Sequence, residues 1–114
     1  MTFIYMNWED MTLVATGHAG GGVYGEDIIC AGVSSLLCAL VNTLEDARKR
    51  GRIKLDLKLD EEHGGDMRIH VEPALGFVGD INAYFRVIMV GLKGIADKYP
   101  ENVKVGEVWT SGNL

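Results

Sequence analysis

The sequence has few residues that crosslink, interrupt or anchor a chain. Its 114 residues include two cysteines and two prolines, and 16 acidic residues outnumber 11 basic ones, which gives a net charge of −5. No stretch gathers enough lysine and arginine to neutralise a row of phosphates, so we predict no direct contact with nucleic acid.

The first ten residues lack a basic region, and we expect no segment to approach the ~20 apolar residues of a membrane span. We therefore predict a cytoplasmic protein that does not bind a membrane.

The two cysteines are expected to be free thiols. Cys30 and Cys38 fall eight residues apart on one predicted helix, about 12 Å along its axis at ~1.5 Å per residue. A disulfide needs Cα atoms within about 7 Å of each other. Because Cys38 lies two turns into an apolar helix, we expect it to be a small buried hydrophobic residue.

Hydrophobic periodicity predicts the order of helices and strands. The predicted elements are strands at 2–7 and 11–17, a helix at 27–50, strands at 53–60 and 67–72, a helix at 80–99 and a short strand near 103–108. With 47% hydrophobic residues, the chain has the size and composition of a single domain that spans residues 1–114. We predict an α+β fold in the order β-β-α-β-β-α-β, with both helices packed on a largely antiparallel sheet.

Two features of the predicted helices bear on packing. The opening turns of the first helix are apolar or small almost all round, so we expect it to be buried between the sheet and another covering element. Gly91 and Gly94 weaken the second helix by about 1 kcal/mol each relative to alanine, but they allow close packing on a neighbour.

A histidine and a cysteine lie at opposite ends of a glycine-rich loop. His18 follows a predicted strand, and Cys30 opens the predicted helix, where free N–H groups and the helix dipole favour a thiolate. A nearby imidazole can take the thiol proton. Ser34 follows Cys30 by one turn on the same face, and Asp27 is a natural N-cap that can also orient the imidazole. The glycines that let this loop approach a ligand closely are Gly20, Gly21, Gly22 and Gly25.

The same glycines match a dinucleotide-binding fingerprint. The spacing Gly20-x-Gly22-x-x-Gly25 follows a predicted strand and precedes a predicted helix. However, Glu26 and Asp27 place two carboxylates at the helix N-terminus, where a pyrophosphate needs the dipole and the free N–H groups for itself. We therefore disfavour a nucleotide cofactor and expect none.

The remaining histidines and cysteines do not form a metal-binding pattern. Zinc sites usually contain two ligands two to four residues apart, and no such pair is present. We therefore expect no metal, and we interpret His63 and His70 as surface histidines. One further interpretation stays open, in which Cys30 is a core cysteine and His18 bonds only to backbone.

Several stretches of the sequence together indicate a family. They are Gly17-His18-Ala19, residues 24–31, Val33-Ser34, residues 90–96 and residues 99–105. These stretches resemble the bacterial ribosomal-processing cysteine proteases, and the likeness covers nearly the whole chain. The resemblance implies a small dimeric endopeptidase in which Cys30 is the nucleophile and His18 the base. It also implies that Asp27 and Ser34 support this pair. Gly91, Gly94 and the apolar face of the last predicted strand are candidate contacts of the implied dimer.

The resemblance further implies a substrate and a place for it. Members of this family remove an extended N-terminal segment from large-subunit ribosomal protein twenty-seven during ribosome assembly, cutting next to aromatic residues. Such a segment is expected to lie along the loop that contains Tyr24 and the glycines. The three consecutive glycines from Gly20 to Gly22 depart from the family pattern and affect substrate preference.

The mechanism that we expect is nucleophilic catalysis by a dyad. His18 deprotonates Cys30, the thiolate attacks the peptide carbonyl, and N–H groups of the helix start around Cys30 hold the oxyanion. Two alternatives stay open. One is a non-enzymatic ribosome assembly factor that binds a peptide without cutting it, and the other is a phage-type protease that acts on capsid or scaffold protein. A thiol redox protein is disfavoured, because the sequence has no Cys-x-x-Cys pair.

Overall fold

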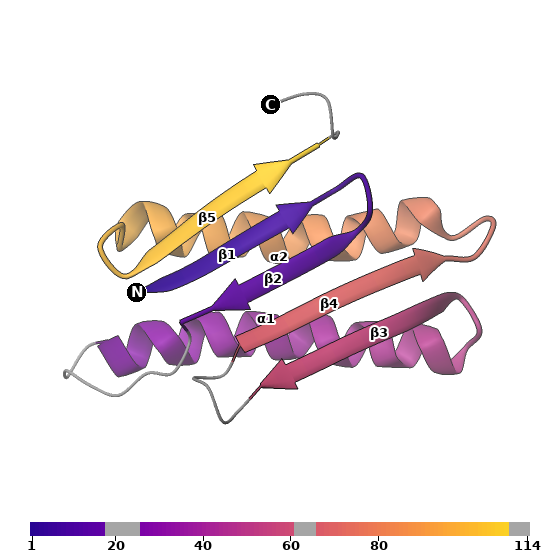
Figure 1. Cartoon of the computed structure of the whole chain (residues 1–114), viewed down its shortest axis with the longest axis horizontal. Helices are drawn as coiled ribbons and strands as arrows, with labels where there is room; N and C mark the ends of the chain where they lie inside the picture. The colour runs from indigo at the N-terminus through magenta and orange to yellow at the C-terminus, as the bar shows by residue number, and fades with distance from the viewer. Residues whose placement is uncertain (18–25, 61–65, 110–114) are drawn as a thin grey trace.

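The computed structural model describes residues 1–17, 26–60 and 66–109, and it confirms the predicted order of helices and strands. The elements are β1 (Thr2–Asn7), β2 (Thr12–Thr16), α1 (Glu26–Lys49), β3 (Ile53–Asp60), β4 (Asp66–Pro73), α2 (Val78–Lys98) and β5 (Val103–Val108) (Figure 1). Each observed boundary lies within two residues of its predicted position, which is the usual uncertainty of such boundaries.

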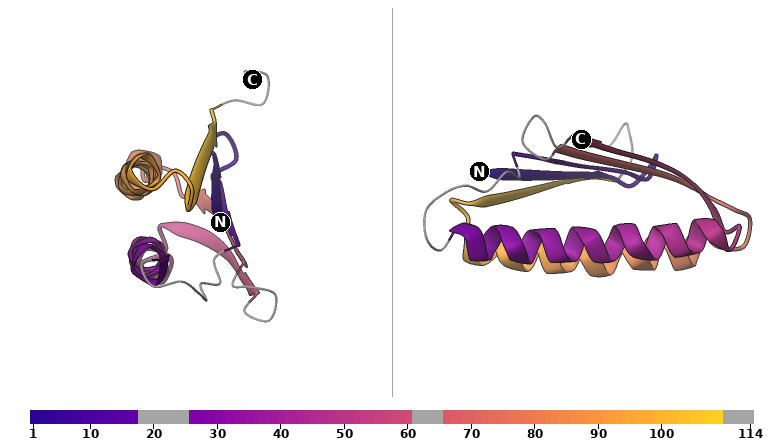
Figure 2. Two further views of the ribbon diagram at one scale, coloured as in Figure 1. Left: turned by 90° about the vertical axis from the view of Figure 1, so that its left-hand side faces the viewer. Right: turned by 90° about the horizontal axis from the view of Figure 1, so that it is seen from below.

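The strands form one five-stranded sheet in the order β3-β4-β2-β1-β5. Both hairpins and the β2–β4 pair are antiparallel, whereas β5 runs parallel to β1 because the chain returns through α2. The sheet is therefore largely antiparallel, as predicted. Both helices cover the same face of the sheet, so the fold has two layers (Figure 2).

The core lies between the sheet and the helix layer. Alternate residues of the central strands, such as Ile4 and Leu13, and one stripe of each helix, such as Leu37 and Phe85, are fully buried there. This pattern follows from the periods of two and 3.6 residues that place apolar side chains on one face of each element. The core holds α1 and α2 against the sheet along most of their length.

The expectation that the first helix is covered on both sides is wrong. Ile28 is 69% exposed and Cys38 is exposed rather than buried, because α1 and α2 lie side by side in a single layer with nothing outside it among the described residues.

The stretch Ile28–Lys49 is long and apolar enough to cross a membrane by length and composition alone, which corrects the prediction that no segment approaches this limit. Only 22% of its most apolar window is buried, but one side of α1 packs on the sheet through Val33 and Leu40.

The candidate dimer contacts are partly used inside the chain. A Cβ atom at Gly91 would lie 3.0 Å from Leu36 Cδ1, so this glycine allows the close approach of α1 and α2. A Cβ atom at Gly94 would have no neighbour within 4 Å. Val103 of β5 is buried in this chain's own core and Val105 packs against that core, so the apolar face of the last strand is not available to a partner.

Substitutions of the two helix glycines are predicted to have opposite effects on the free energy of unfolding. We expect Gly94→Ala to raise the free energy of unfolding by about 1 kcal/mol, because alanine favours the helix and meets no neighbour. Gly91→Val, which must displace Leu36, is expected to lower it by about 1–3 kcal/mol. Chemical denaturation monitored by circular dichroism checks both values, and a stabilising Gly91→Val substitution would contradict the close helix packing.

Candidate active site

Four chain segments that are far apart in sequence lie towards one end of the molecule. The C-terminal ends of β2 and β3 and the first residues of α1 and β4 lie at the left-hand end in Figure 1. The predicted site residues His18, Gly20, Gly21, Gly22, Tyr24 and Gly25, and also His63, lie outside the described residues. The described part of the site consists of the segments that join these residues to the sheet and to α1.

Cys30 is a half-buried free thiol near the start of α1. The helix begins at Glu26, so Cys30 is its fifth residue and lies one turn inside the helix rather than at its opening. In a regular helix the N–H groups without an intrahelical partner belong to the first turn, and the N–H of Cys30 is already bonded. Because Cα–Cβ bonds tilt towards the helix N-terminus, the thiol still leans towards those free N–H groups. An oxyanion would therefore be held by the first turn and not by the backbone of Cys30.

The two residues expected to support the dyad both lie on α1. Ser34 is half-buried and follows Cys30 by four residues, which places both on one face of the helix as predicted. Asp27 is the second residue of α1, so the prediction that it is the N-cap is wrong, and its side chain is outside the described part of the structure. The sequence could not fix this point, because Gly25, Glu26 and Asp27 are all compatible with a helix start.

His70 has a structural role in the sheet. Its Nδ1 atom lies 2.9 Å from Oγ1 of Thr12, its cross-strand partner on β2, and the ring is half-buried. His70 lies next to the fully buried Ile69, so it points to the sheet face away from the helices, as predicted. No cluster of three or more metal-ligating side chains occurs within residues 1–17, 26–60 and 66–109.

Gly17 is held tightly at the point where β2 ends. Its φ angle of +70° is in the left-handed region, and a Cβ atom on it would lie 2.3 Å from the carbonyl oxygen of Met1. Its N–H donates to Oδ1 of Asp66 at 3.2 Å, and its carbonyl accepts from the hydroxyl of Thr2 at 3.5 Å. No other residue fits this position without strain. No local pattern in the sequence points to Asp66 or Thr2, because they contact Gly17 across separations of 49 and 15 residues.

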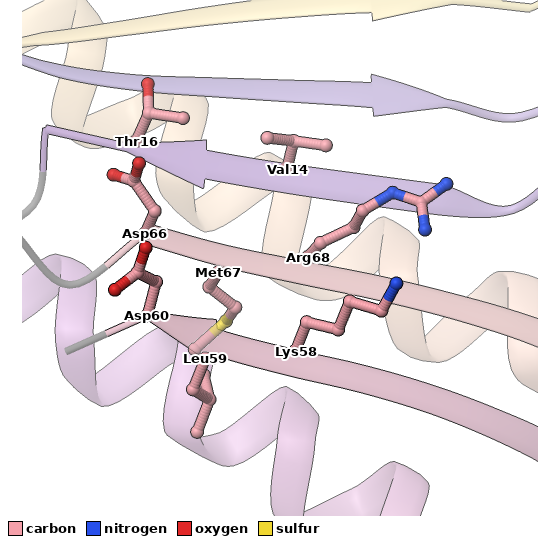
Figure 3. Close-up of a pocket in the computed structure, with 8 residues that line it drawn as sticks. All are labelled: Val14, Thr16, Lys58, Leu59, Asp60, Asp66, Met67 and Arg68. Atoms are coloured by element: carbon pink, nitrogen blue, oxygen red, sulfur yellow. The ribbon is translucent and has the colours of Figure 1, made fainter. Parts of the chain in front are cut away.

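A shallow cavity of about 240 Å³ lies at the same end of the sheet. It is lined by Val14, Thr16, Lys58, Leu59, Asp60, Asp66, Met67 and Arg68, and Cys30 is not among them. Figure 3 shows Asp60 and Asp66 near Thr16 at one end of this cavity and Lys58 and Arg68 at the other. Asp60 faces Asp66 and Lys58 faces Arg68 in the β3–β4 register, so two like-charged pairs lie next to each other.

Comparisons with known proteins agree on one family. The model of the family "Cysteine protease Prp" matches residues 1–104. The ribosomal processing cysteine protease Prp of Staphylococcus aureus is 27% identical over 93 residues, which is 82% of each chain.

Solved structures share the fold. The crystal structure of SMU.848 from Streptococcus mutans has a TM-score of 0.75 and 30% identity, covering 96% of this chain and 93% of that chain. The Staphylococcus aureus protease Prp in complex with a substrate peptide has a TM-score of 0.73 and 23% identity, covering 95% of this chain and 100% of that chain. Since the family model spans nearly the whole sequence, this chain belongs to the Prp family of cysteine proteases, which act in ribosomal processing.

Proposed function

We propose that this protease removes the N-terminal extension of large-subunit ribosomal protein twenty-seven with a dyad of Cys30 and His18. The observation that supports it most directly is the placement of Cys30, a half-buried free thiol leaning towards the free N–H groups at the start of a helix. Cys38, the other thiol of the chain, is exposed two turns further along α1 and has no such surroundings. Membership of a protease family disfavours the alternative of a non-enzymatic peptide-binding factor.

In the proposed mechanism His18 takes up and gives back a proton in each of two half-reactions. The imidazole of His18 takes the thiol proton, and the sulfur of Cys30 attacks the carbonyl carbon of the scissile peptide bond. The free N–H groups of the first turn of α1 stabilise the oxyanion of the tetrahedral intermediate. The imidazolium then gives its proton to the leaving amine, which leaves a thioester between Cys30 and the N-terminal product. Water, deprotonated by His18, then attacks the thioester carbonyl and the C–S bond breaks. The N-terminal product leaves as a carboxylic acid, and the imidazolium of His18 returns its proton to the sulfur of Cys30.

Charge complementarity supports a ribosomal protein as the substrate. Proteins that bind ribosomal RNA carry basic residues that neutralise phosphates, and this chain has a net charge of −5. A structurally similar protein, the Staphylococcus aureus protease Prp, was crystallised with a substrate peptide and with a covalently linked product peptide. In this chain we propose that Tyr24 and the glycines of residues 20–25 hold the extended peptide. The reaction needs a reduced thiol, which fits the cytoplasm.

We also propose that the protease is a homodimer that associates through the outer face of its helix layer. Val87 and Val90 on α2 are 69% and 62% exposed, and their spacing of three residues places them side by side on one helix face. A groove of about 280 Å³ between α1 and α2 lies beside them, lined by Ala39, Leu40, Thr43, Tyr84, Val87 and Ile88. A second copy would cover the side of the apolar helix α1 that the sheet leaves open.

The proposed dyad predicts different outcomes for the two cysteines. Cys30→Ala is expected to lower the cleavage rate by at least about a thousandfold with the fold unchanged, because the nucleophile is lost. Cys38→Ala, the matched control, should keep the wild-type rate. The measurement is intact mass spectrometry of ribosomal protein twenty-seven with its extension after incubation with each variant. A single cut that persists in Cys30→Ala would exclude the proposed nucleophile, and a cut only in capsid or scaffold protein would favour the phage-type alternative.

The proposed dimer face predicts a change in assembly. We expect Val87→Glu combined with Val90→Glu to weaken dimerisation by at least about tenfold, because charges must then be buried in an apolar interface. Leu75→Glu is the matched control, since Leu75 is fully exposed outside both helices. Sedimentation velocity over a concentration series measures the dissociation constants. A wild-type chain that stays monomeric, or a dimer that tolerates both charges, would show that this face is not the interface.

A further inference from the structure

We propose that Asp66 is a positioning residue of the protease, which holds Gly17 and thereby fixes where the catalytic loop leaves the sheet. This inference rests on the proposed function, in which His18, the residue bonded directly to Gly17, is the base of the dyad. Asp66 does not contact the reacting atoms in this proposal and acts only through the backbone of Gly17. No motif in the sequence and no step of the proposed reaction assigns a role to Asp66.

Three contacts fix the backbone of Gly17 from different sides. The Asp66 carboxylate accepts its N–H at 3.2 Å, and a hydrogen bond to a charged acceptor is stronger than one to a neutral group. The hydroxyl of Thr2 donates to its carbonyl oxygen at 3.5 Å. The carbonyl of Met1 occupies the space of a Cβ atom, so the chain approaches β1 as closely as it can. Together these contacts set the orientation of Gly17 at the end of β2.

The composition of the following loop makes such an anchor necessary. Residues 20–22 and residue 25 are all glycine, and glycine has more conformational freedom to lose than any other residue. A general base must lie within hydrogen-bond distance of the proton that it takes, and a misplacement of about 1 Å can cost a hundredfold in rate. The local sequence around His18 supplies no constraint of this kind. Asp66, which is 49 residues away in sequence, supplies one at Gly17.

The charge of Asp66 and its hydrogen bond to Gly17 can be separated by substitution. Asp66 faces Asp60 in the β3–β4 register, where like charges repel, and Lys58 and Arg68 at the neighbouring paired position offset part of this repulsion. Both carboxylates lie at the same end of the cavity in Figure 3. An alanine at position 66 would relieve this repulsion but lose the bond to Gly17. An asparagine would relieve the repulsion and keep an oxygen that accepts the same N–H.

The test separates activity from stability in three variants. Asp66→Ala is expected to lower kcat by about tenfold with KM changed less than about twofold and with the melting temperature unchanged or higher. Asp66→Asn should keep kcat within about threefold of wild type, because its amide oxygen rescues the hydrogen bond. Asp60→Ala, which removes the same charge from the facing position, should keep wild-type kcat. The substrate is a synthetic peptide that spans the extension of ribosomal protein twenty-seven.

A second readout reports on the dyad without any substrate. The alkylation rate of Cys30 by iodoacetamide is measured at pH 6.5 and at pH 9 in each variant. If Asp66 positions the base, Asp66→Ala lowers the rate at pH 6.5 several-fold relative to the rate at pH 9, and Asp66→Asn does not. A purely structural role would leave this ratio unchanged.

The outcomes distinguish the two proposals. If the wild type cleaves the peptide and Asp66→Ala cleaves it equally fast, the role of Asp66 is overturned. The proposed dyad is not affected by that result. Equal losses in Asp66→Ala and Asp60→Ala, or in Asp66→Ala and Asp66→Asn, would show a charge effect at this end of the sheet and would also overturn it. A wild-type chain that neither cleaves the peptide nor reacts faster at Cys30 than at Cys38 would overturn the proposed function, and the inference with it.

Discussion

The rest of the structure depends on the mismatch in length between α1 and the sheet that covers it. The 24 residues of α1 extend over about 36 Å, whereas the longest strands, of 8 residues, extend over about 26 Å. The helix is held from one side along most of its length, and its first turns project beyond the ends of β3 and β4 (Figure 1). Val33 is therefore fully buried, whereas Ile28 is 69% exposed and Cys30 is half-buried. Packing alone thus places a thiol where a substrate can reach it on an element that cannot move freely.

The two members of the proposed dyad are positioned by different physical means. Cys30 lies on a helix that is fixed by the core, so its placement is a consequence of hydrophobic burial. His18 follows a strand end that is fixed by hydrogen bonds and by the close approach of Gly17 to Met1. A loop between two fixed ends closes at a modest entropic cost that grows only slowly with its length. The glycines of the loop are then available to contact the substrate, because the positions of the two loop ends do not depend on them.

The sequence was sufficient to predict the order of helices and strands, because each has a clear hydrophobic period. The alternation in residues 53–60 and the helical repeat that contains Leu37 and Leu40 are examples. Periodicity gives the apolar residues of a helix but not the number of layers that cover it, and so Cys38 was wrongly expected to be buried. The parallel pairing of β5 with β1 depends on the path of the chain through α2, which no local pattern contains.

The candidate site was predictable in its chemistry and not in its supports. Residue types and spacing around Cys30 indicate thiol catalysis, since a nucleophile and a base have recognisable requirements. The contact between Gly17 and Asp66 joins two residues that are ordinary in their own surroundings, and it exists only once β2 and β4 pair. Two carboxylates facing each other at a strand end contradict the usual preference for opposite charges across a sheet. Under the proposed role of Asp66, the stability lost to this local conflict is exchanged for a fixed geometry at Gly17.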